Sequence, residues 1–424
     1  MSEALAPAAG WVCPFCALAC DHLELQVGCD DEPLALRRGD CPRARVGLQG
    51  FASRSTPVLP TVDGHATTLD AALAAAAQRL AVSRQPLFAG LGIDVAGARA
   101  LYPLASACGA ICDGANGAAL MHTLRALQDR GQFTTTLAEV RTRADVMVFV
   151  GSVPTDLAPL LGERCGLGGS EVATRHIAAL HPRTADAAVL AAWSGAGTTV
   201  ESIAPPGDLF NTLATLNAAL ARPGATAWPA ALRALAERLR AARYAVLIGA
   251  PLHLPAHGAL IVETVNRLIG RLNVDSRAAA LWIDSANSAA TTNQVLAWLS
   301  GLPLRSRAGP HGLEHEPLQF DSTRLLDGAA VDLLLWVSCF DAAARPPPCT
   351  LPLIVLGHPA QAAAAARPGA VCIPVATPGI GADGHVFRTD GSVLMPLRAV
   401  RPDALPSVAE VAQRLLTSLR SGAA

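Results

Sequence analysis

The sequence contains no lysine, so all 33 of its basic residues are arginines. Without lysine, the chain cannot build the phosphate-binding loop of P-loop NTPases or form a Schiff base with a carbonyl compound. No G-x-G-x-x-G directly follows a predicted strand, so dinucleotide binding of the usual kind is not predicted. Charged residues make up only 16 % of the chain and the net charge is −1. Such a balance predicts neither nucleic acid nor an anionic membrane as a partner.

Long apolar runs and secretion signals are also missing. No stretch reaches the roughly 18 uncharged apolar residues that a membrane-spanning helix needs. The first residues lack a basic segment followed by an apolar one, which is the pattern of a signal peptide. Without such a signal, an odd number of cysteines, 11, argues against a disulfide framework and for a reducing compartment. We therefore expect a cytoplasmic protein.

What the sequence does have is a cysteine pattern near its N-terminus. Cys13, Cys16 and Cys20 form a C-x2-C-x3-C arm, and Cys41 follows after 20 further residues. Four thiolates brought to one point are what a [4Fe–4S] cluster needs, because each iron takes one sulfur ligand from the protein. A four-thiolate zinc site is the alternative, but it usually pairs two C-x2-C knuckles, and only one is present here. The spacing predicts an iron–sulfur cluster in preference to zinc.

Beyond residue 57, short apolar runs alternate with helical patterns, which is typical of βαβ units and a parallel sheet. The predicted strands are Leu87–Leu91, Val146–Gly151, Ile177–His181, Val200–Ile203, Ala245–Gly249, Leu281–Ile283, Leu333–Ser338, Leu353–Gly357 and Val371–Val375. The predicted helices are Ala71–Leu80, Gly97–Ala107, Asp208–Ala221, Pro229–Ala242, Ala259–Leu272, Thr292–Leu299 and Val408–Leu416.

Two of these strands share one plan. Asp145 enters the strand that ends at Gly151, and Asp332 enters the strand that ends at Ser338; in each case the next strand ends in His-Pro. The repeat predicts two Rossmann-like halves with ligand sites at the carboxyl ends of their strands. The expected α/β architecture is a four-cysteine domain over 1–57, Rossmann-like regions over 58–240 and 241–400, and a C-terminal helix over 401–424.

Several stretches together resemble a known family. They are Cys13–His22, Ala126–Asp129, Thr136–Asp145 leading into the strand to Gly151, and Gly384–Asp390 before the predicted strand Leu394–Leu397. This arrangement is similar to the molybdopterin- or tungstopterin-dependent formate dehydrogenases, and more closely to the B-type subunit of formylmethanofuran dehydrogenase. The resemblance spans nearly the whole chain and implies a molybdopterin oxidoreductase-like fold.

One position departs from the family pattern. Catalytic members bind the metal through a cysteine that a histidine follows directly, but here Met121 precedes His122. A neutral thioether cannot replace a thiolate on a high-valent metal. Cys108 and Cys112 lie nearby in a run that reads as a buried strand, and Cys112 is the one alternative ligand. The resemblance therefore implies that no molybdenum or tungsten pterin is bound and that the chain has no catalytic or pterin-binding residues of its own.

The family also suggests a role without redox chemistry. Methylotrophic and related bacteria have a formyltransferase/hydrolase complex whose chains resemble the A-, B-, C- and D-type chains of formylmethanofuran dehydrogenase. The resemblance implies that this chain is the B-type subunit, a scaffold for the A-type hydrolase, the C-type subunit and the D-type formyltransferase in tetrahydromethanopterin-linked formaldehyde oxidation. The alternative is a redox-active B-type chain of formylmethanofuran dehydrogenase with a pterin-bound metal and a [4Fe–4S] cluster.

Three further patterns are less specific. His311–Glu316 is framed by prolines, which favours a solvated loop over a metal site. Gly379–His385 is a glycine-rich stretch that would approach the pterin in the redox family, or else serve as a flexible connection. No serine lies in a G-x-S-x-G motif, so the sequence predicts no serine hydrolase site.

Overall fold

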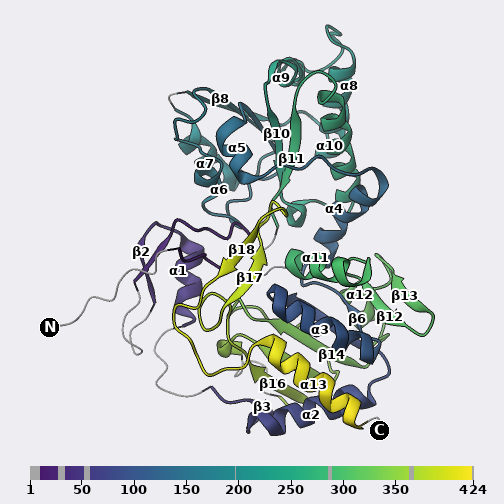
Figure 1. The fold of residues 1–424 in the computed structure, drawn as a ribbon. Coiled ribbons are helices and arrows are strands. Elements are labelled where there is room, and N and C mark those ends of the chain that lie inside the picture. Colours follow the sequence, from purple (N-terminus) through teal and green to yellow (C-terminus); the bar gives the residue numbers. More distant parts are fainter. Residues whose placement is uncertain are drawn as a thin grey trace, which may run out of the picture. The chain divides into compact units, whose positions relative to one another are not determined.

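The computed structural model describes residues 10–26, 34–51, 58–195, 197–284, 289–361 and 367–422. The chain forms two compact units: unit 1 comprises 1–117 and 286–424, and unit 2 comprises 118–285. Unit 2 is therefore inserted into the sequence of unit 1. Both units combine helices with largely parallel sheets (Figure 1), which confirms the α/β class. No helix within the described ranges is both long and apolar enough to cross a membrane.

The cysteine-rich segment belongs to unit 1. Two short strands, β1 (Glu24–Gln26) and β2 (Ala35–Arg38), pair antiparallel and are followed by helix α1 (Pro42–Gln49). Gly47 lies against the Phe15 ring, where a Cβ would come within 2.4 Å of the ring carbon Cγ. The missing side chain therefore lets α1 pack directly onto the cysteine arm.

The core of unit 1 is a nine-stranded sheet in the order β13-β12-β6-β5-β14-β15-β16-β3-β4. The strands β6, β5, β14, β15 and β16 pair in parallel, and antiparallel hairpins extend both edges. Within the parallel part the order follows the 2-1-3-4-5 pattern of flavodoxin-like folds. The strands span Thr61–Val62 (β3), His65–Ala66 (β4), Pro86–Gly92 (β5), Ile111–Cys112 (β6), Ser306–Gly309 (β12), Gly312–His315 (β13), Leu333–Ser338 (β14), Leu353–Gly357 (β15) and Ala370–Pro374 (β16).

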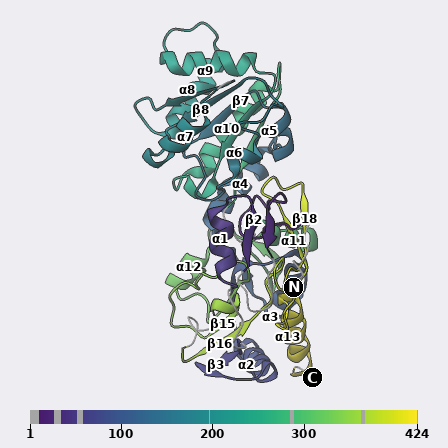
Figure 2. The ribbon, with the colours of Figure 1, turned by 90° about the vertical axis from the view of Figure 1, so that its left-hand side faces the viewer.

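Helices cover both faces of this sheet. The helix α13 packs against α2 and α3, and α11 packs against α3. Figure 2 shows α12 on the opposite side of strands β15 and β16 from α3 and α13. A separate hairpin of β17 and β18 precedes α13. The elements span Leu69–Val82 (α2), Val95–Cys108 (α3), Ala289–Ser300 (α11), Ser322–Asp327 (α12), Pro359–Gln361 (the 3-10 turn η3), Gly384–Phe387 (β17), Leu394–Leu397 (β18) and Val408–Gly422 (α13).

Unit 2 is built on a five-stranded, fully parallel sheet in the order β11-β10-β7-β8-β9. Counted along the chain this is the 3-2-1-4-5 order of the Rossmann fold, whose topological switch point lies between the first and fourth strands, here β7 and β10. The strands span Val146–Val150 (β7), Arg175–Leu180 (β8), Thr198–Ile203 (β9), Ala245–Gly249 (β10) and Ala278–Trp282 (β11).

Two helical layers enclose this sheet. The helices α8, α9 and α10 contribute their leucines and valines to one core cluster with the strands. On the other face, Phe149 of β7 stacks on Trp193 of α7, with ring centroids 5.4 Å apart. Figure 1 shows α5, α6 and α7 on this side. The helices span Gly117–Arg130 (α4), Leu137–Arg143 (α5), Leu161–Arg164 (α6), Ala187–Trp193 (α7), Leu209–Ala221 (α8), Ala230–Ala241 (α9) and Gly258–Leu272 (α10), with 3-10 turns at Thr184–Asp186 (η1) and Pro251–His253 (η2).

The expected domain boundaries differ from these units. The boundary between residues 240 and 241 falls inside unit 2, because β10 pairs with β7 in one continuous sheet. In unit 1, β5 pairs with β14 although unit 2 lies between them in the sequence, so the two sheets are not consecutive regions. The C-terminal helix packs within unit 1 and is not a separate segment. The expected linker at 53–57 lies outside the described residues.

The individual elements agree more closely with expectation. The strands predicted at Ala245–Gly249, Leu333–Ser338 and Leu353–Gly357 have these bounds in the structure. The run from Cys108 to Cys112 is not one strand: Cys108 ends α3, Gly109 caps it with a φ of +63°, and only the last two residues form β6. The left-handed glycine ends the helix, a feature that the apolar composition concealed.

Candidate functional site

The four N-terminal cysteines are all buried in unit 1. The amide of Cys13 donates a hydrogen bond to the Cys20 oxygen at 2.8 Å, which closes the C-x2-C-x3-C arm into a loop. Within the loop, Ala19 has a φ of +41°, a conformation that is unfavourable for a residue with a Cβ. Cys41 is the N-cap residue of α1, where the partial positive charge of the helix N-terminus favours a negatively charged group.

The thiols of this arm are close enough to influence one another. Burial raises the pKa of Cys13 well above its usual value, and the charges of Cys16, Cys20 and Cys41 raise it further. Burial also raises the pKa of Cys16, against the opposing charge of Arg43. In a dry site these sulfurs therefore repel one another as thiolates, and only a bound cationic centre would make the fully ionised set stable.

The cysteine arm is attached to the glycine-rich stretch near the C-terminus. The indole N–H of Trp11 donates to the backbone oxygen of Gly379 at 3.0 Å, and Thr389 donates its amide to the Ala17 oxygen at 2.8 Å. Thr377 donates its hydroxyl to the Cys339 oxygen at 2.6 Å, so the stretch is fixed on its other side as well. Gly379 and the residues on either side of Gly379–His385 are therefore hydrogen-bonded to other parts of unit 1.

No three side chains of His, Cys, Asp or Glu in the described part of the chain gather closely enough to hold a single metal ion. This applies to the four cysteines and equally to His311–Glu316. The latter segment contains strand β13, which pairs with β12 in a β-hairpin, and Arg307 of β12 pairs with Glu314 at 2.7 Å. His315 is directed back to the Arg305 oxygen at 3.0 Å. The structure gives these charged residues a role in the hairpin itself.

The position that the resemblance matches to the metal-binding cysteine of the redox family is helical. Met121 and His122 lie on α4, and Met121 is buried with an exposed fraction of 4 %. The ring of His122 lies over Gly258 at the start of α10, where a Cβ would come within 2.7 Å of it. Both residues thus take part in packing in unit 2, and Met121 has no ionisable atom to offer a metal.

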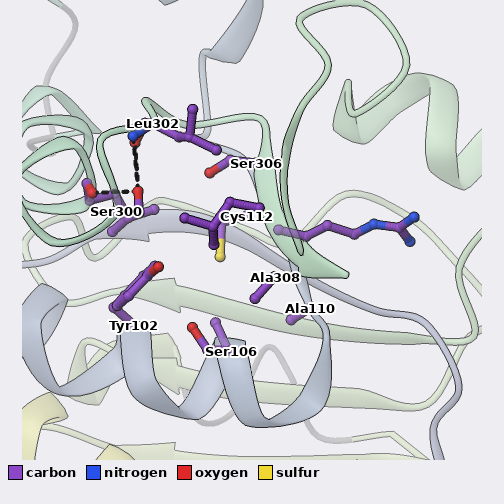
Figure 3. A pocket seen from close by; sticks show the side chains of 12 residues that line it. Tyr102, Ser106, Ala110, Cys112, Ser300, Leu302, Ser306 and Ala308 are labelled. Atoms are coloured by element: carbon purple, nitrogen blue, oxygen red, sulfur yellow. Dashed lines mark hydrogen bonds between the residues drawn. The ribbon is translucent and has the colours of Figure 1, made fainter. Parts of the chain in front are cut away.

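Cys112, the alternative metal ligand, lies in unit 1. It lines a small pocket between α3, β12 and the end of α11. Figure 3 shows its sulfur among Tyr102, Ser106 and Ala308. Burial, together with the neighbouring charge of Asp113, raises the pKa of Cys112 to about 12. In the absence of a bound metal, a thiol with this pKa stays protonated at neutral pH. Only about 10 Å³ of the pocket is open to the centre of a water-sized sphere, which is roughly room for one water molecule.

Sequence reasoning missed one polar cluster in unit 2. Ser152 follows β7 and His253 follows β10, with Ser152 Oγ 2.6 Å from His253 Nδ1. Asp156 Oδ2 lies 3.1 Å from His253 Nε2. A search for a local motif could not find this set, because its members come from turns 101 positions apart. The available signal was the strand order, since both turns follow strands at the switch point.

Known proteins of similar sequence share this architecture. The B-type subunit of the formyltransferase/hydrolase complex Fhc from Methylorubrum extorquens is 33 % identical over 365 residues, which cover 85 % of this chain and 96 % of that protein. The chain belongs to this B-type family. A crystal structure of the complex FhcABCD from the same organism, with methylofuran, contains a chain that matches with a TM-score of 0.74 and 31 % identity. The match covers 86 % of this chain and 100 % of that one.

The B-type family also has a redox relative. The B-type subunit of the tungsten-containing formylmethanofuran dehydrogenase 2 from Methanocaldococcus jannaschii is 25 % identical over 437 residues, covering 92 % of this chain and 95 % of that protein. No protein-family model matches the sequence. The family resemblance that the sequence suggested through the cysteine arm and three further stretches is therefore confirmed.

Proposed function

We propose that this chain is the B-type subunit of a formyltransferase/hydrolase complex in tetrahydromethanopterin-linked formaldehyde oxidation. Its partners are the A-type hydrolase, the C-type subunit and the D-type formyltransferase, which it holds together in the cytoplasm without performing redox chemistry. The observation that carries the proposal is the 33 % identity over 85 % of the chain to the B-type subunit of such a complex. The cysteines from Cys108 to Cys372 form no disulfides, which supports a reducing compartment.

The loss of redox chemistry is supported by α4. The inferred molybdopterin oxidoreductase-like layout puts Met121 where the redox relatives supply a thiolate, and Met121 is buried in helix packing. Cys112 is buried on β6, and no group of three His, Cys, Asp or Glu side chains in the described part of the chain forms a metal site with it. Without a thiolate ligand the chain has no group suited to holding molybdenum or tungsten.

We also propose that Cys13, Cys16, Cys20 and Cys41 hold a [4Fe–4S] cluster, with zinc as the alternative. Support comes from the four buried thiols of one segment, whose ionised forms would repel one another unless a cationic centre were bound. A single zinc ion would need all four sulfurs within about 2.3 Å of one point. A cluster places one cysteine on each iron and accepts a wider set of sulfurs. The bound cluster or zinc ion would link the cysteine arm to Cys41 at the start of α1.

Co-expression tests the assembly. The tagged chain is produced together with the A-, C- and D-type subunits and purified anaerobically. We expect the four chains to co-elute and to hydrolyse a formyl carrier to formate without an electron acceptor. Failure of the chain to co-purify with the other three would refute the proposed role.

Elemental analysis of the same sample tests the cofactors. We expect iron near four atoms per chain and neither molybdenum nor tungsten. Cys20→Ala should lose the iron, whereas Cys372→Ala, which alters a buried cysteine of β16, should retain it. Stoichiometric molybdenum or tungsten with viologen-linked activity would favour the redox alternative instead.

A further inference from the structure

The carboxyl ends of three neighbouring strands meet in unit 2. The strand β7 lies between β10 and β8, and the chain reverses its direction of strand addition between β7 and β10. In open α/β sheets this switch point is where the loops diverge and ligands bind. Here two polar side chains from the diverging turns are bonded to each other across that point.

The turn after β7 presents a serine. Gly151 has a φ of +81°, which only glycine adopts readily, and it bends the chain sharply at the end of the strand. Ser152 follows directly, with 6 % of its surface exposed. Its Oγ lies 2.6 Å from Nδ1 of His253 in the turn η2 after β10. The serine hydroxyl is thus held at the switch point by a short hydrogen bond to a base.

The far side of the imidazole is oriented by a carboxylate. Nε2 of His253 lies 3.1 Å from Asp156 Oδ2. Asp156 is fixed in turn by Arg183, whose Nη2 lies 3.2 Å from Oδ1, and Arg183 is held by Asp186 at 3.0 Å. Burial lowers the pKa of His253 below 6.5, with Asp156 opposing the shift and Arg183 adding to it. At neutral pH the ring is therefore uncharged.

These contacts define the positions of the protons. Asp156 can only accept, so the neutral ring carries its proton on Nε2 and leaves Nδ1 as an acceptor. Ser152 then donates its hydroxyl proton to Nδ1. This is the arrangement of nucleophile, base and orienting group that activates a serine, formed by Nδ1 in place of the more common Nε2.

We propose that Ser152, His253 and Asp156 form a nucleophilic site that accepts acyl groups from small activated esters and transfers them to water. Ser152 Oγ attacks the ester carbonyl while its proton passes to His253 Nδ1. The ester bond breaks, and the alcohol leaves with that proton. Water then attacks the acyl-serine, gives one proton to Nδ1 and releases the acid as the serine recovers its proton. The sum is ester plus water to acid plus alcohol.

The substrate class follows from the group that would stabilise the oxyanion. In serine hydrolases the amide after the nucleophile often donates to it. Here the Val153 amide already donates to Asp186 Oδ2 at 3.0 Å. The loss of one such donor costs about 100- to 1,000-fold in rate. We therefore expect slow turnover, limited to esters with good leaving groups and to comparably reactive phosphonofluoridates.

A covalent probe tests the site on the purified full-length chain. A fluorophosphonate should form a phosphonyl ester on Ser152 with loss of fluoride, as read by intact mass and peptide mapping. The rate should rise with pH and reach half its plateau below pH 6.5, because the His253 pKa is lowered from that value. His253→Ala should slow labelling about 100-fold through loss of the general base. Asp156→Asn alters a half-exposed carboxylate and provides a second slowed variant should His253→Ala fail to fold.

The other sheet supplies a matched control. Ser338 ends β14 in unit 1, one position before the residue that corresponds to Ser152, and its Oγ has no hydrogen-bond partner among the described residues. Ser338→Ala should leave labelling unchanged, and Ser152→Ala should abolish it. Absence of label from Ser152 in the folded protein, or equal rates in wild type and both His253→Ala and Asp156→Asn, would overturn the proposal. The test uses the isolated chain, so its outcome does not depend on complex assembly.

Discussion

The indole of Trp11 donates a buried hydrogen bond to the backbone oxygen of Gly379 across 368 positions of sequence. Gly379 has a φ of +87° and lies against Pro14, so the two segments meet at a turn that needs glycine. The cysteine arm is thus part of the folded core of unit 1 and not an appended module. Its contribution to stability can be measured separately from any bound cofactor.

Trp11→Phe should destabilise unit 1. The phenyl ring keeps most of the packing but leaves the buried Gly379 oxygen without its donor, at a cost of about 1–3 kcal/mol. Denaturant unfolding of the metal-free protein measures the change. Trp298→Phe is the control, because Trp298 is 59 % exposed and contacts Phe387 only edge-on. Equal stability of the two variants would contradict this prediction.

Asp113→Ala should be among the most destabilising substitutions in unit 1. Asp113 is buried at the end of β6, where it accepts hydrogen bonds from Arg305 at 3.2 Å and from the Ser322 hydroxyl at 2.8 Å. Removal leaves a buried guanidinium short of one partner, which costs about 3–5 kcal/mol.

The matched control for this buried pair is an exposed one. Asp70 pairs with Arg414 on the surface, with side chains 84 % and 48 % exposed. Asp70→Ala should cost less than about 1 kcal/mol, because water screens and solvates such charges. Urea midpoints of both variants give the comparison, and a smaller loss for Asp113→Ala than for Asp70→Ala would show that the buried pair does not stabilise the fold.

Unfolding should become easier in mild acid because of His358. Burial lowers its pKa from 6.5 to about 4, with Asp341 opposing the shift. As the pH falls below 6.5, His358 becomes protonated in the unfolded chain. In the folded chain it becomes protonated only near pH 4. The free energy of unfolding should therefore fall by about 3 kcal/mol over this window and depend little on this group below it.

His358→Asn should flatten that dependence. An asparagine oxygen can still accept from the Ala360 amide, which donates to His358 Nδ1 at 3.0 Å, but it does not titrate. Denaturant unfolding at several pH values compares the slopes, with the exposed His65→Asn as the control. If the free energy of unfolding varied with pH equally in wild type and His358→Asn, His358 would not be the cause of the pH dependence.

Cys112 should resist alkylation. Its thiol is 5 % exposed and its pKa is raised by burial to about 12, so at pH 8 the reactive thiolate is scarce. Iodoacetamide on the native protein, followed by peptide mapping, should modify the partly exposed Cys349 first. The difference should vanish in denaturant. Rapid modification of Cys112 in the native protein would contradict this prediction and show that its thiol is accessible and reactive.

Much of the secondary structure was predictable because apolar strands carry their own signal. β14 has six consecutive buried residues, as parallel strands covered on both faces do, and its bounds follow directly from composition. α4 was not predicted, because its exposed face and its glycine-rich start weaken the helical pattern. The short strands of the β12–β13 hairpin were missed for a similar reason: charged residues there resemble a solvated loop.

The order of those strands in space was beyond local patterns. β5 pairs with β14 although all of unit 2 lies between them in the sequence. No local periodicity predicts that pairing. The predicted division at residue 240 assumed that neighbours in sequence share a sheet, which holds for most connections but not for an insertion. The cysteine positions, in contrast, depend on covalent spacing, so they could be identified without a fold.

The sequence by itself determined the family, the four-cysteine arm and the absence of a thiolate at position 121, because these are properties of residue identity and spacing. Only the tertiary structure decided that Ser152 meets His253, because that contact depends on β7 and β10 lying side by side. Strand order is set by packing between distant segments, and the chemistry of the switch point follows from it.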